Sequence, residues 1–278
     1  MAVINRTPDS FYDRGATYGF GAALDAAGRA IEDGAGIVDI GGVKAGPGDD
    51  VSVAEEIRRV TVLVAAVRAG HPGVVISVDT WRAEVGEAVA QAGADLLNDA
   101  WGGADPRLAE VAAAHGIGLV CAHAGGLAPR TRPHRPAYRD VVADVTAYVT
   151  AEAARAVRAG VDPERILIDP AHDFGKNTWH SLALTRHTAA LAATGWPVLV
   201  APSNKDFVGE TLGLPVPERG EGTLAVLAVS AWEGARVFRV HDVPAARQAL
   251  AAVAALREEC PAAARPGTAV RGRGTRRT

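Results

Sequence analysis

The sequence predicts an α/β protein built as a single (β/α)8 TIM barrel. Three observations lead to this fold class. Eight short runs rich in β-branched residues recur along the chain, helical patterns lie between them, and together they fill about 255 residues, the usual size of such a barrel. An open doubly wound sheet also alternates strands and helices, but the count of eight favours the barrel.

The eight expected strands are mostly continuous apolar runs rather than alternating ones. This pattern is typical of strands that are buried on both faces. The runs are Val3-Ile4, Ile37–Ile40, Val74–Val78, Leu96-Leu97, Leu119–Cys121, Ile166–Ile168, Val198–Val200 and Val237–Val240.

The segments between the strands show helical periodicity and helix-start signals. Apolar residues recur with a period near 3.6 over residues 53–67 and 85–92. Ser52 with Glu55 matches a capping box, and Asp105-Pro106 and Asp162-Pro163 each match an N-cap residue followed by a first-turn proline. Because no linker interrupts this alternation, we expect one barrel domain over residues 1–257.

Composition and charge exclude several classes of protein. Apolar residues make up 48% and charged residues 22% of the 278, which excludes a disordered, fibrous or disulfide-scaffold chain. No apolar run approaches the roughly 18 residues of a membrane span, and no signal peptide is visible. Cys121 and Cys260 are too far apart in sequence to indicate a disulfide framework, and Cys121 lies in an apolar run. We therefore expect a cytoplasmic protein with reduced thiols and a buried Cys121.

The last segment of the chain differs from the rest. Residues 261–278 carry five arginines and no acid, and they are rich in glycine and proline. We interpret residues 258–278 as a disordered basic tail. Binding of RNA or of a membrane surface is less favoured, because the segment contains no aromatic residue on which bases stack.

Polar side chains follow the expected strands, at the barrel end where active sites lie. The three lysines and four asparagines of the chain all lie at or just after a strand end. Chance and turn preference explain the asparagines better than the lysines. The residues at these ends are Asn5, Lys44, Asp79, Asn98, His123, Asp169, Ser203, Asn204, Lys205, Arg239 and His241.

The chemistry of these side chains indicates two kinds of contact. Amides and carboxylates at Asn5, Asp79, Asn98 and Asp169 suit a heterocycle with ring N–H donors and carbonyl acceptors. Lys205, Arg239 and His241 follow the last two strands, where barrels commonly bind phosphate, and a Mg²⁺ ion would share phosphate oxygens with Asn5. Taken alone, His241 is equally compatible with a buried, hydrogen-bonded histidine.

Several segments resemble dihydropteroate synthase in order along nearly the whole barrel. They are Asn5-Arg6-Thr7-Pro8-Asp9-Ser10-Phe11, Val38–Gly42, Ile76–Thr80, Asn98–Gly103, Phe174–Lys176, Gly209–Gly213 and Arg239–Val243. The resemblance implies a barrel, usually a homodimer. It also implies a transferase of folate biosynthesis that uses Mg²⁺ and condenses 7,8-dihydro-6-hydroxymethylpterin pyrophosphate with 4-aminobenzoate, releasing pyrophosphate.

The resemblance also implies roles for residues of this sequence. Asp79, Asn98, Asp169 and Lys205 would hold the pterin, with Asp169 and Lys205 as catalytic residues, since the Asp169 carboxylate would stabilise the pterin cation left by pyrophosphate. Asn5, Lys44, Arg239 and His241 would hold pyrophosphate, with Asn5 also at the metal. Phe174 and Ser203 would flank 4-aminobenzoate, and residues 7–15 would form a mobile loop.

The sequence departs from the family on the side of the second substrate. Where the family has a Thr-Arg pair that helps hold pyrophosphate and aminobenzoate, this chain has Ala45-Gly46. The family's Ser-Arg-Lys is Ser203-Asn204-Lys205, and two glycines of the family's loop after strand six are Ala171 and Asp173. Asp173 adds a negative charge, and Ala171 crowds a backbone that needed glycine.

Three functions remain open at this point. The chain is a working synthase in which Lys44 replaces the lost charge, a catalytically inactive or repurposed pterin-binding paralogue, or a pterin-dependent methyl-transfer barrel. Arg239 with His241 argues against the third, which binds no pyrophosphate. The basic residues Arg130, Arg132, His134 and Arg135 would add an anion site, although a solvated loop explains them better.

Overall fold

The computed structural model describes residues 1–8, 15–131 and 137–257, and within them eight parallel strands follow one another in chain order. Strands β1 to β6 pair successively in one sheet, and β7 pairs with β8. The strands are β1 (Ala2–Asn5), β2 (Ile37–Gly41), β3 (Val75–Asp79), β4 (Leu96–Asp99), β5 (Gly118–Ala122), β6 (Ile166–Asp169), β7 (Leu199–Val200) and β8 (Val237–Phe238). Each overlaps one of the apolar runs.

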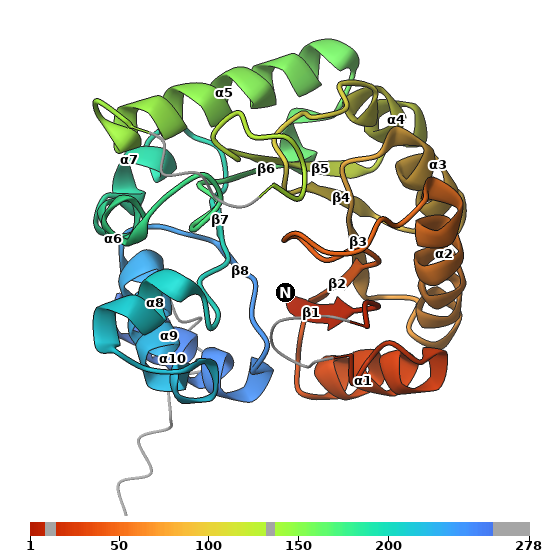
Figure 1. Cartoon of the computed structure of the whole chain (residues 1–278), viewed down its shortest axis with the longest axis horizontal. Helices are drawn as coiled ribbons and strands as arrows, with labels where there is room; N and C mark the ends of the chain where they lie inside the picture. Colours follow the sequence, from red (N-terminus) through yellow and green to blue (C-terminus); the bar gives the residue numbers. More distant parts are fainter. Residues whose placement is uncertain (9–14, 132–136, 258–278) are drawn as a thin grey trace, which may run out of the picture.

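Two parallel bridges join these strands into a closed ring. Ile168 of β6 pairs with Val198, the residue before β7, and Ala2 of β1 pairs with Val240, two residues after β8. The Val240 amide donates to the Met1 carbonyl at 2.9 Å, and the Val3 amide donates to the Val240 carbonyl at 3.1 Å. Figure 1 shows the strands inside a ring of helices, so the predicted (β/α)8 barrel is confirmed.

Ten α-helices of the described residues surround the strands, two each after β6 and β7. They are α1 (Phe20–Glu32), α2 (Val53–Gly70), α3 (Ala83–Gln91), α4 (Arg107–His115), α5 (Val141–Ala159), α6 (Thr178–Arg186), α7 (Thr188–Ala192), α8 (Asp206–Leu212), α9 (Gly220–Trp232) and α10 (Val243–Leu256).

The helix-start signals are confirmed in part. The Ser52 side chain caps α2 by accepting from the Glu55 amide, whereas the Glu55 carboxylate accepts from Arg58 and Arg59 rather than completing the predicted capping box. Asp105 accepts from the Arg107 amide, but the N-cap residue of α4 is Pro106. Asp162 caps a three-residue 3-10 turn, Pro163–Arg165, rather than an α-helix. That turn leads directly into β6, which leaves no room for a longer helix.

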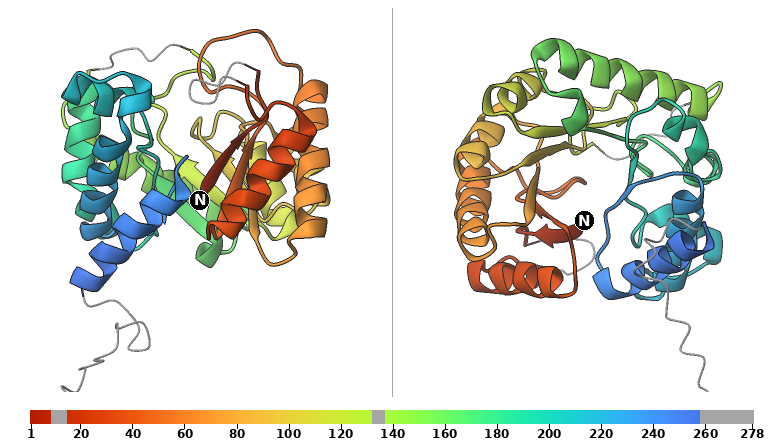
Figure 2. Two further views of the ribbon diagram at one scale, coloured as in Figure 1. Left: turned by 90° about the horizontal axis from the view of Figure 1, so that it is seen from below. Right: turned by 180° about the vertical axis from the view of Figure 1, so that it is seen from behind.

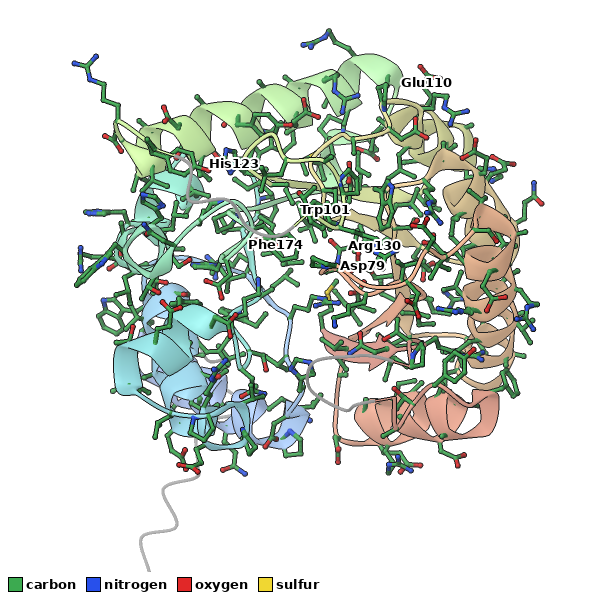
Figure 3. All side chains as sticks on the ribbon, in the orientation of Figure 1. Asp79, Trp101, Glu110, His123, Arg130 and Phe174 are labelled. Carbon is green, nitrogen blue, oxygen red and sulfur yellow. The ribbon has the colours of Figure 1, made fainter. Side chains whose placement is uncertain are left out.

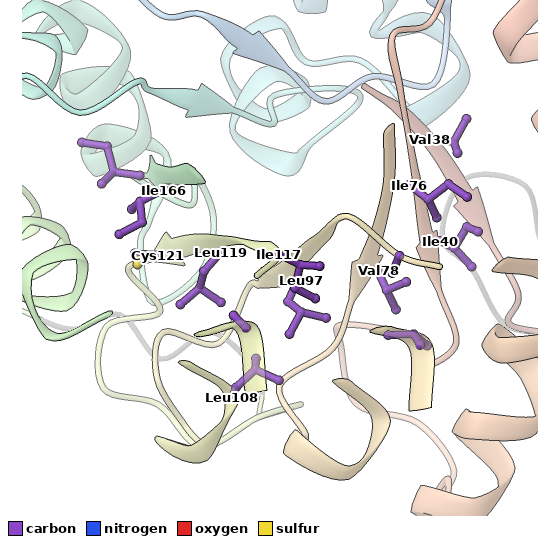
Figure 4. Packing of buried hydrophobic residues seen from close by; sticks show 14 of the residues in the cluster. Val38, Ile40, Ile76, Val78, Leu97, Leu108, Ile117, Leu119, Cys121 and Ile166 are labelled. Carbon is purple, nitrogen blue, oxygen red and sulfur yellow. The ribbon is translucent and has the colours of Figure 1, made fainter. Parts of the chain in front are cut away.

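The core has two layers because alternate strand residues point outward and inward. Outward side chains, among them Val38, Ile76 and Leu97, pack against the helices (Figure 4). A smaller inner cluster, with Leu96, Val120, Leu199 and Ala201 as its buried members, fills the barrel. Each fully buried aliphatic side chain contributes about 1.5–3 kcal/mol to stability, so both layers hold the strand ends in place.

The strand register gathers the polar strand ends at one edge. Asn5 is level with Gly41, Gly41 with Asp79, and Asp79 with Asn98. In Figure 2, left, loops that follow the strands gather at the upper end of the molecule. The candidate site therefore lies at this end, as expected for a barrel.

Two further expectations concern the periphery. Cys121 is a free, buried cysteine, as predicted. Among the described residues, no helix combines the length and the apolar character needed to cross a membrane. The predicted basic tail, residues 258–278, lies outside the described part of the chain.

Candidate functional site

A cavity of about 100 Å³, here called the first cavity, opens at the carboxyl ends of the strands. Nine of the ten predicted site residues line it, from seven different strands or the loops that follow them. These nine are Asn5, Lys44, Asp79, Asn98, Asp169, Phe174, Lys205, Arg239 and His241. Figure 3 shows Asp79 and Phe174 near the centre of the barrel. The strand-end reasoning thus found a set of residues that the fold brings together.

Ser203 is the predicted site residue that does not line the first cavity. Its hydroxyl lies 2.8 Å from Nδ1 of His241 and accepts a hydrogen bond from the His241 amide at 3.2 Å. The side chain is buried. Ser203 therefore orients His241, which itself reaches the cavity.

Asp39 on β2 organises the floor of the site, and it was not among the predicted site residues. Its fully buried carboxylate accepts from Ser77 Oγ at 2.5 Å, from Asn98 Nδ2 at 3.2 Å and from Arg239 Nε at 2.6 Å. Arg239 Nη2 also donates to Asp79 Oδ2 at 3.2 Å. One acid thus fixes an amide and a guanidinium that line the first cavity. The signal in the sequence was an acidic residue inside an apolar strand run.

Burial shifts the ionisation of the groups around the first cavity. It raises the pKa of Asp79 to about 7, against the opposing effect of Arg239. It also raises the pKa of Asp169, which Lys205 opposes, and it lowers the pKa of Lys205, which Asp173 and Asp169 oppose. These groups are poorly solvated, so a ligand with complementary N–H and C=O groups gains more here than in water.

Lys176 is enclosed by acceptors and serves the fold rather than a ligand. Its Nζ donates to the carbonyls of His123, Phe174 and Ala171 at 2.7, 2.8 and 3.2 Å, and lies 2.9 Å from His123 Nδ1. Burial lowers the pKa of Lys176 to about 7. Burial and then Lys176 lower the pKa of His123 to about 4, so the imidazole is neutral. This contact ties the end of β5 to the loop after β6.

The loop after β6 contains two residues in the left-handed region. Ala171 has φ 49° and Asp173 has φ 69°, a conformation that costs a residue with a Cβ roughly 1–2 kcal/mol relative to glycine. Asp173 is held there because its Oδ1 accepts from Ser181 Oγ at 3.0 Å and its Oδ2 from the Phe207 amide at 3.2 Å. The crowding predicted at Ala171 therefore appears in the structure as a strained, left-handed backbone conformation.

A second cavity of about 320 Å³ adjoins the first. The rings of Trp101 and Phe174 meet edge to face there, with centroids 5.2 Å apart (Figure 3). Lys44, Ala45, Phe174 and Lys205 line both cavities, and Gly46, Trp101, Leu127, Thr131, Asp173, Gly175, Asp206 and Val216 line only the second. The altered residues of the second loop and of the loop after β6 thus meet around this cavity.

The basic loop after β5 is described only in part. Arg130 has φ 65°, and its Nε is buried without a hydrogen bond in the structure. Arg132, His134 and Arg135 lie outside the described residues, so an anion site at this loop stays a prediction.

Comparisons with known proteins agree with this geometry. A family model described as pterin binding enzyme matches residues 1–241. The chain is 58% identical over 276 residues to a Mycobacterium tuberculosis protein named inactive dihydropteroate synthase 2, covering 98% of this chain and 86% of the relative. It is 40% identical over 245 residues to Bacillus subtilis dihydropteroate synthase, covering 87% of this chain and 83% of the relative.

Solved structures show the same fold. Yersinia pestis dihydropteroate synthase in a sulfonamide complex superposes with a TM-score of 0.87 at 36% identity, covering 94% of each chain. The Xanthomonas albilineans enzyme with 4-aminobenzoic acid gives a TM-score of 0.84 at 36% identity, covering 94% of this chain and 93% of that one. Since the family model covers residues 1–241 and relatives at 58% and 40% identity span 98% and 87% of this chain, the chain belongs to the pterin-binding enzyme family of dihydropteroate synthase.

Proposed function

We propose that this protein binds a pterin in the first cavity and does not condense it with 4-aminobenzoate at the rate of a synthase. One observation carries the proposal. The first cavity keeps all four predicted pterin-binding side chains, whereas the second cavity has Ala45 and Gly46 where the family has a Thr-Arg pair. The relatives named inactive dihydropteroate synthase 2 support the loss of synthase activity.

The pterin side of the site offers the required hydrogen-bonding groups. Asp79 and Asp169 present carboxyl groups to ring N–H donors, and Asn98 presents an amide that Asp39 orients. Lys205 lies at the same cavity with its Nζ 4.9 Å from the centroid of the Phe174 ring. A flat heterocycle with alternating donors and acceptors would satisfy these poorly solvated groups.

The phosphate side keeps fewer cations. Arg239 is already paired with Asp39 and Asp79, so its charge is partly neutralised, and His241 and Lys44 complete the proposed pyrophosphate contacts. Each absent arginine removes a charge-assisted hydrogen bond of about 1.5–3 kcal/mol, roughly ten- to hundredfold in affinity. The pyrophosphate group should therefore bind more weakly, and its departure from the pterin as a leaving group should be slower.

Asn5 is the proposed protein contact of a Mg²⁺ ion. Mg²⁺ is usually held by one or two protein oxygens together with substrate phosphates and water, and the Asn5 amide at the first cavity fits that set. Among residues 1–8, 15–131 and 137–257, no cluster of His, Cys, Asp or Glu forms a separate metal cage. The ion, when bound, would neutralise phosphate charge.

Lys44 favours the second candidate function, a working synthase. It lines both cavities, so a positive charge is kept on the side of the site where the family's arginine is absent. A lysine offers a point charge rather than the bidentate fork of an arginine. We therefore expect that Lys44, in place of the family's arginine, would support residual rather than full synthase activity.

Calorimetric titration with the pterin pyrophosphate and Mg²⁺, followed by addition of 4-aminobenzoate and measurement of released pyrophosphate, tests the proposal. Pterin binding without appreciable turnover supports it. Turnover at the rate of the Bacillus subtilis enzyme in the same assay supports the synthase instead, and absence of any pterin binding contradicts both.

We also propose a homodimer, in keeping with the family resemblance. Val229 and Trp232 of α9 are 46% and 53% exposed, and Leu256 of α10 is 73% exposed. These apolar side chains would be covered by a second copy. Light scattering of the protein and of Trp232→Glu tests this.

A cytoplasmic location stays a proposal that rests on the cysteine usage.

A further inference from the structure

Among the described residues, the formal charges of the side chains that line the second cavity sum to zero. Lys44 and Lys205 contribute two positive charges, and Asp173 and Asp206 contribute two negative ones. Ala45 lines the cavity with a side chain that offers no hydrogen bond. A ligand carboxylate would therefore meet acids as well as lysines here.

Asp173 presents a carboxylate that the fold holds in place. Ser181 Oγ and the Phe207 amide each donate to one of its oxygens, at 3.0 and 3.2 Å. Each oxygen keeps a further lone pair, and the side chain is partly exposed at the cavity. A fixed, poorly solvated acceptor favours a ligand that brings an N–H donor and disfavours one that brings a second anion.

Two other charged side chains of the cavity act on Asp173. Lys205 Nζ donates to the His172 carbonyl at 2.6 Å and lies over the Phe174 ring, and its positive charge offsets part of the negative charge of Asp173. Asp206 is 79% exposed at its side chain and paired with Arg219 at 2.9 Å. Asp173 is thus the acid that a ligand in the second cavity would meet away from bulk water.

The remaining walls suit a flat aromatic ring. Trp101 and Phe174 meet edge to face at 5.2 Å, and Leu127 and Val216 add apolar surface. A planar ring can pack against such apolar and aromatic surface.

We propose that the second cavity binds an aromatic amine without a carboxylate, and that Asp173 sets this preference. The inference rests on the proposed function, since it identifies the class of ligand that would lie beside the pterin. 4-Aminobenzamide represents that class, because it matches 4-aminobenzoate in shape and replaces one carboxylate oxygen with an NH₂ donor.

Competing titrations test this proposal. The pterin is titrated first; then the pterin-bound protein, or the free protein if no pterin binds, is titrated with 4-aminobenzamide and with 4-aminobenzoate at slightly alkaline pH. We expect the amide to bind about tenfold more tightly. In Asp173→Asn and Asp173→Gly the preference should fall to about twofold or less, and melting curves confirm that both variants fold. Asp206→Asn, at the exposed acid of the same cavity, should keep the preference.

Several results would overturn it. Equal or tighter binding of 4-aminobenzoate contradicts the proposal, and a loss of that binding in Arg130→Ala would assign carboxylate recognition to the basic loop instead. Binding of neither amine contradicts it, as does an amide preference that survives Asp173→Asn. Failure of pterin binding alone refutes only the proposed function, because the two amines are still compared on the free protein.

Discussion

Replacing Asp39 with asparagine tests whether this buried acid holds the site together. The side chain is fully buried and accepts from Ser77, Asn98 and Arg239. Asparagine has nearly the same shape but carries no charge, and only its oxygen accepts. Among the residues that the structure describes, the change therefore leaves Asp79 as the acidic partner of Arg239.

The expected cost follows from the geometry of the pair. Removing one partner of a buried ion pair costs about 3–5 kcal/mol, because the other charge stays uncompensated. Since Asp79 lies 3.2 Å from Arg239 Nη2, we expect the lower end, about 3 kcal/mol. For a domain of this size that corresponds to a fall in Tm of roughly 6–12 °C.

Urea denaturation of Asp39→Asn and Ser77→Ala provides the comparison. Ser77→Ala removes one hydrogen bond to the same carboxylate and should cost about 1 kcal/mol. Adding Arg239→Met to Asp39→Asn should recover part of the loss, because the uncompensated charge is removed. If Asp39→Asn costs no more than Ser77→Ala, Asp39 does not hold Arg239 as described.

Three further changes probe the loops around the first cavity. Lys205→Ala should abolish pterin binding in a titration while leaving the Tm nearly unchanged; unchanged pterin affinity would remove Lys205 from the pocket. Lys176→Met should flatten the dependence of stability on pH. The pKa of Lys176 in the folded protein, about 7, lies below its ordinary value of 10.5, so between these two pH values the unfolded chain binds a proton that the folded chain does not. Wild-type stability therefore rises with pH over this range, by at most about 1.4 kcal/mol per pH unit. A wild-type slope of the opposite sign in urea titrations would contradict this. Ala171→Gly should raise stability by about 0.5–1 kcal/mol, because relief of the left-handed strain exceeds the added freedom of the unfolded chain; a lower Tm would show that Ala171 is not strained.

The fold could be predicted from the sequence because strands and helices alternate regularly. Continuous apolar runs marked all eight strands, even β7 and β8, which are two residues long in the structure. Residues 198 and 240 pair through single bridges, and such closure depends on tertiary geometry that a local pattern does not carry. The second helix after β6 and the second helix after β7 were not predicted either, because their boundaries also depend on tertiary geometry.

The candidate site was predictable wherever a polar residue followed a strand. Asp79 and Asn98 are examples, since the parallel register brings strand ends to one edge. Asp39 was missed because it lies inside a strand, where its partners are set by neighbouring strands rather than by nearby sequence. Lys176 was noticed for its rarity, but its enclosure by carbonyls depends on how two loops fold together. Ser203 was assigned to 4-aminobenzoate, and that role stays a prediction; its contact with His241 across two strand ends could not be read from the sequence.

The most direct test of the account is a titration of the full chain with the pterin pyrophosphate and Mg²⁺, with pyrophosphate release followed after 4-aminobenzoate is added. The account predicts pterin binding, lost in Lys205→Ala, with turnover far below that of Bacillus subtilis dihydropteroate synthase measured beside it. Turnover equal to that enzyme, or no pterin binding at all, would contradict it.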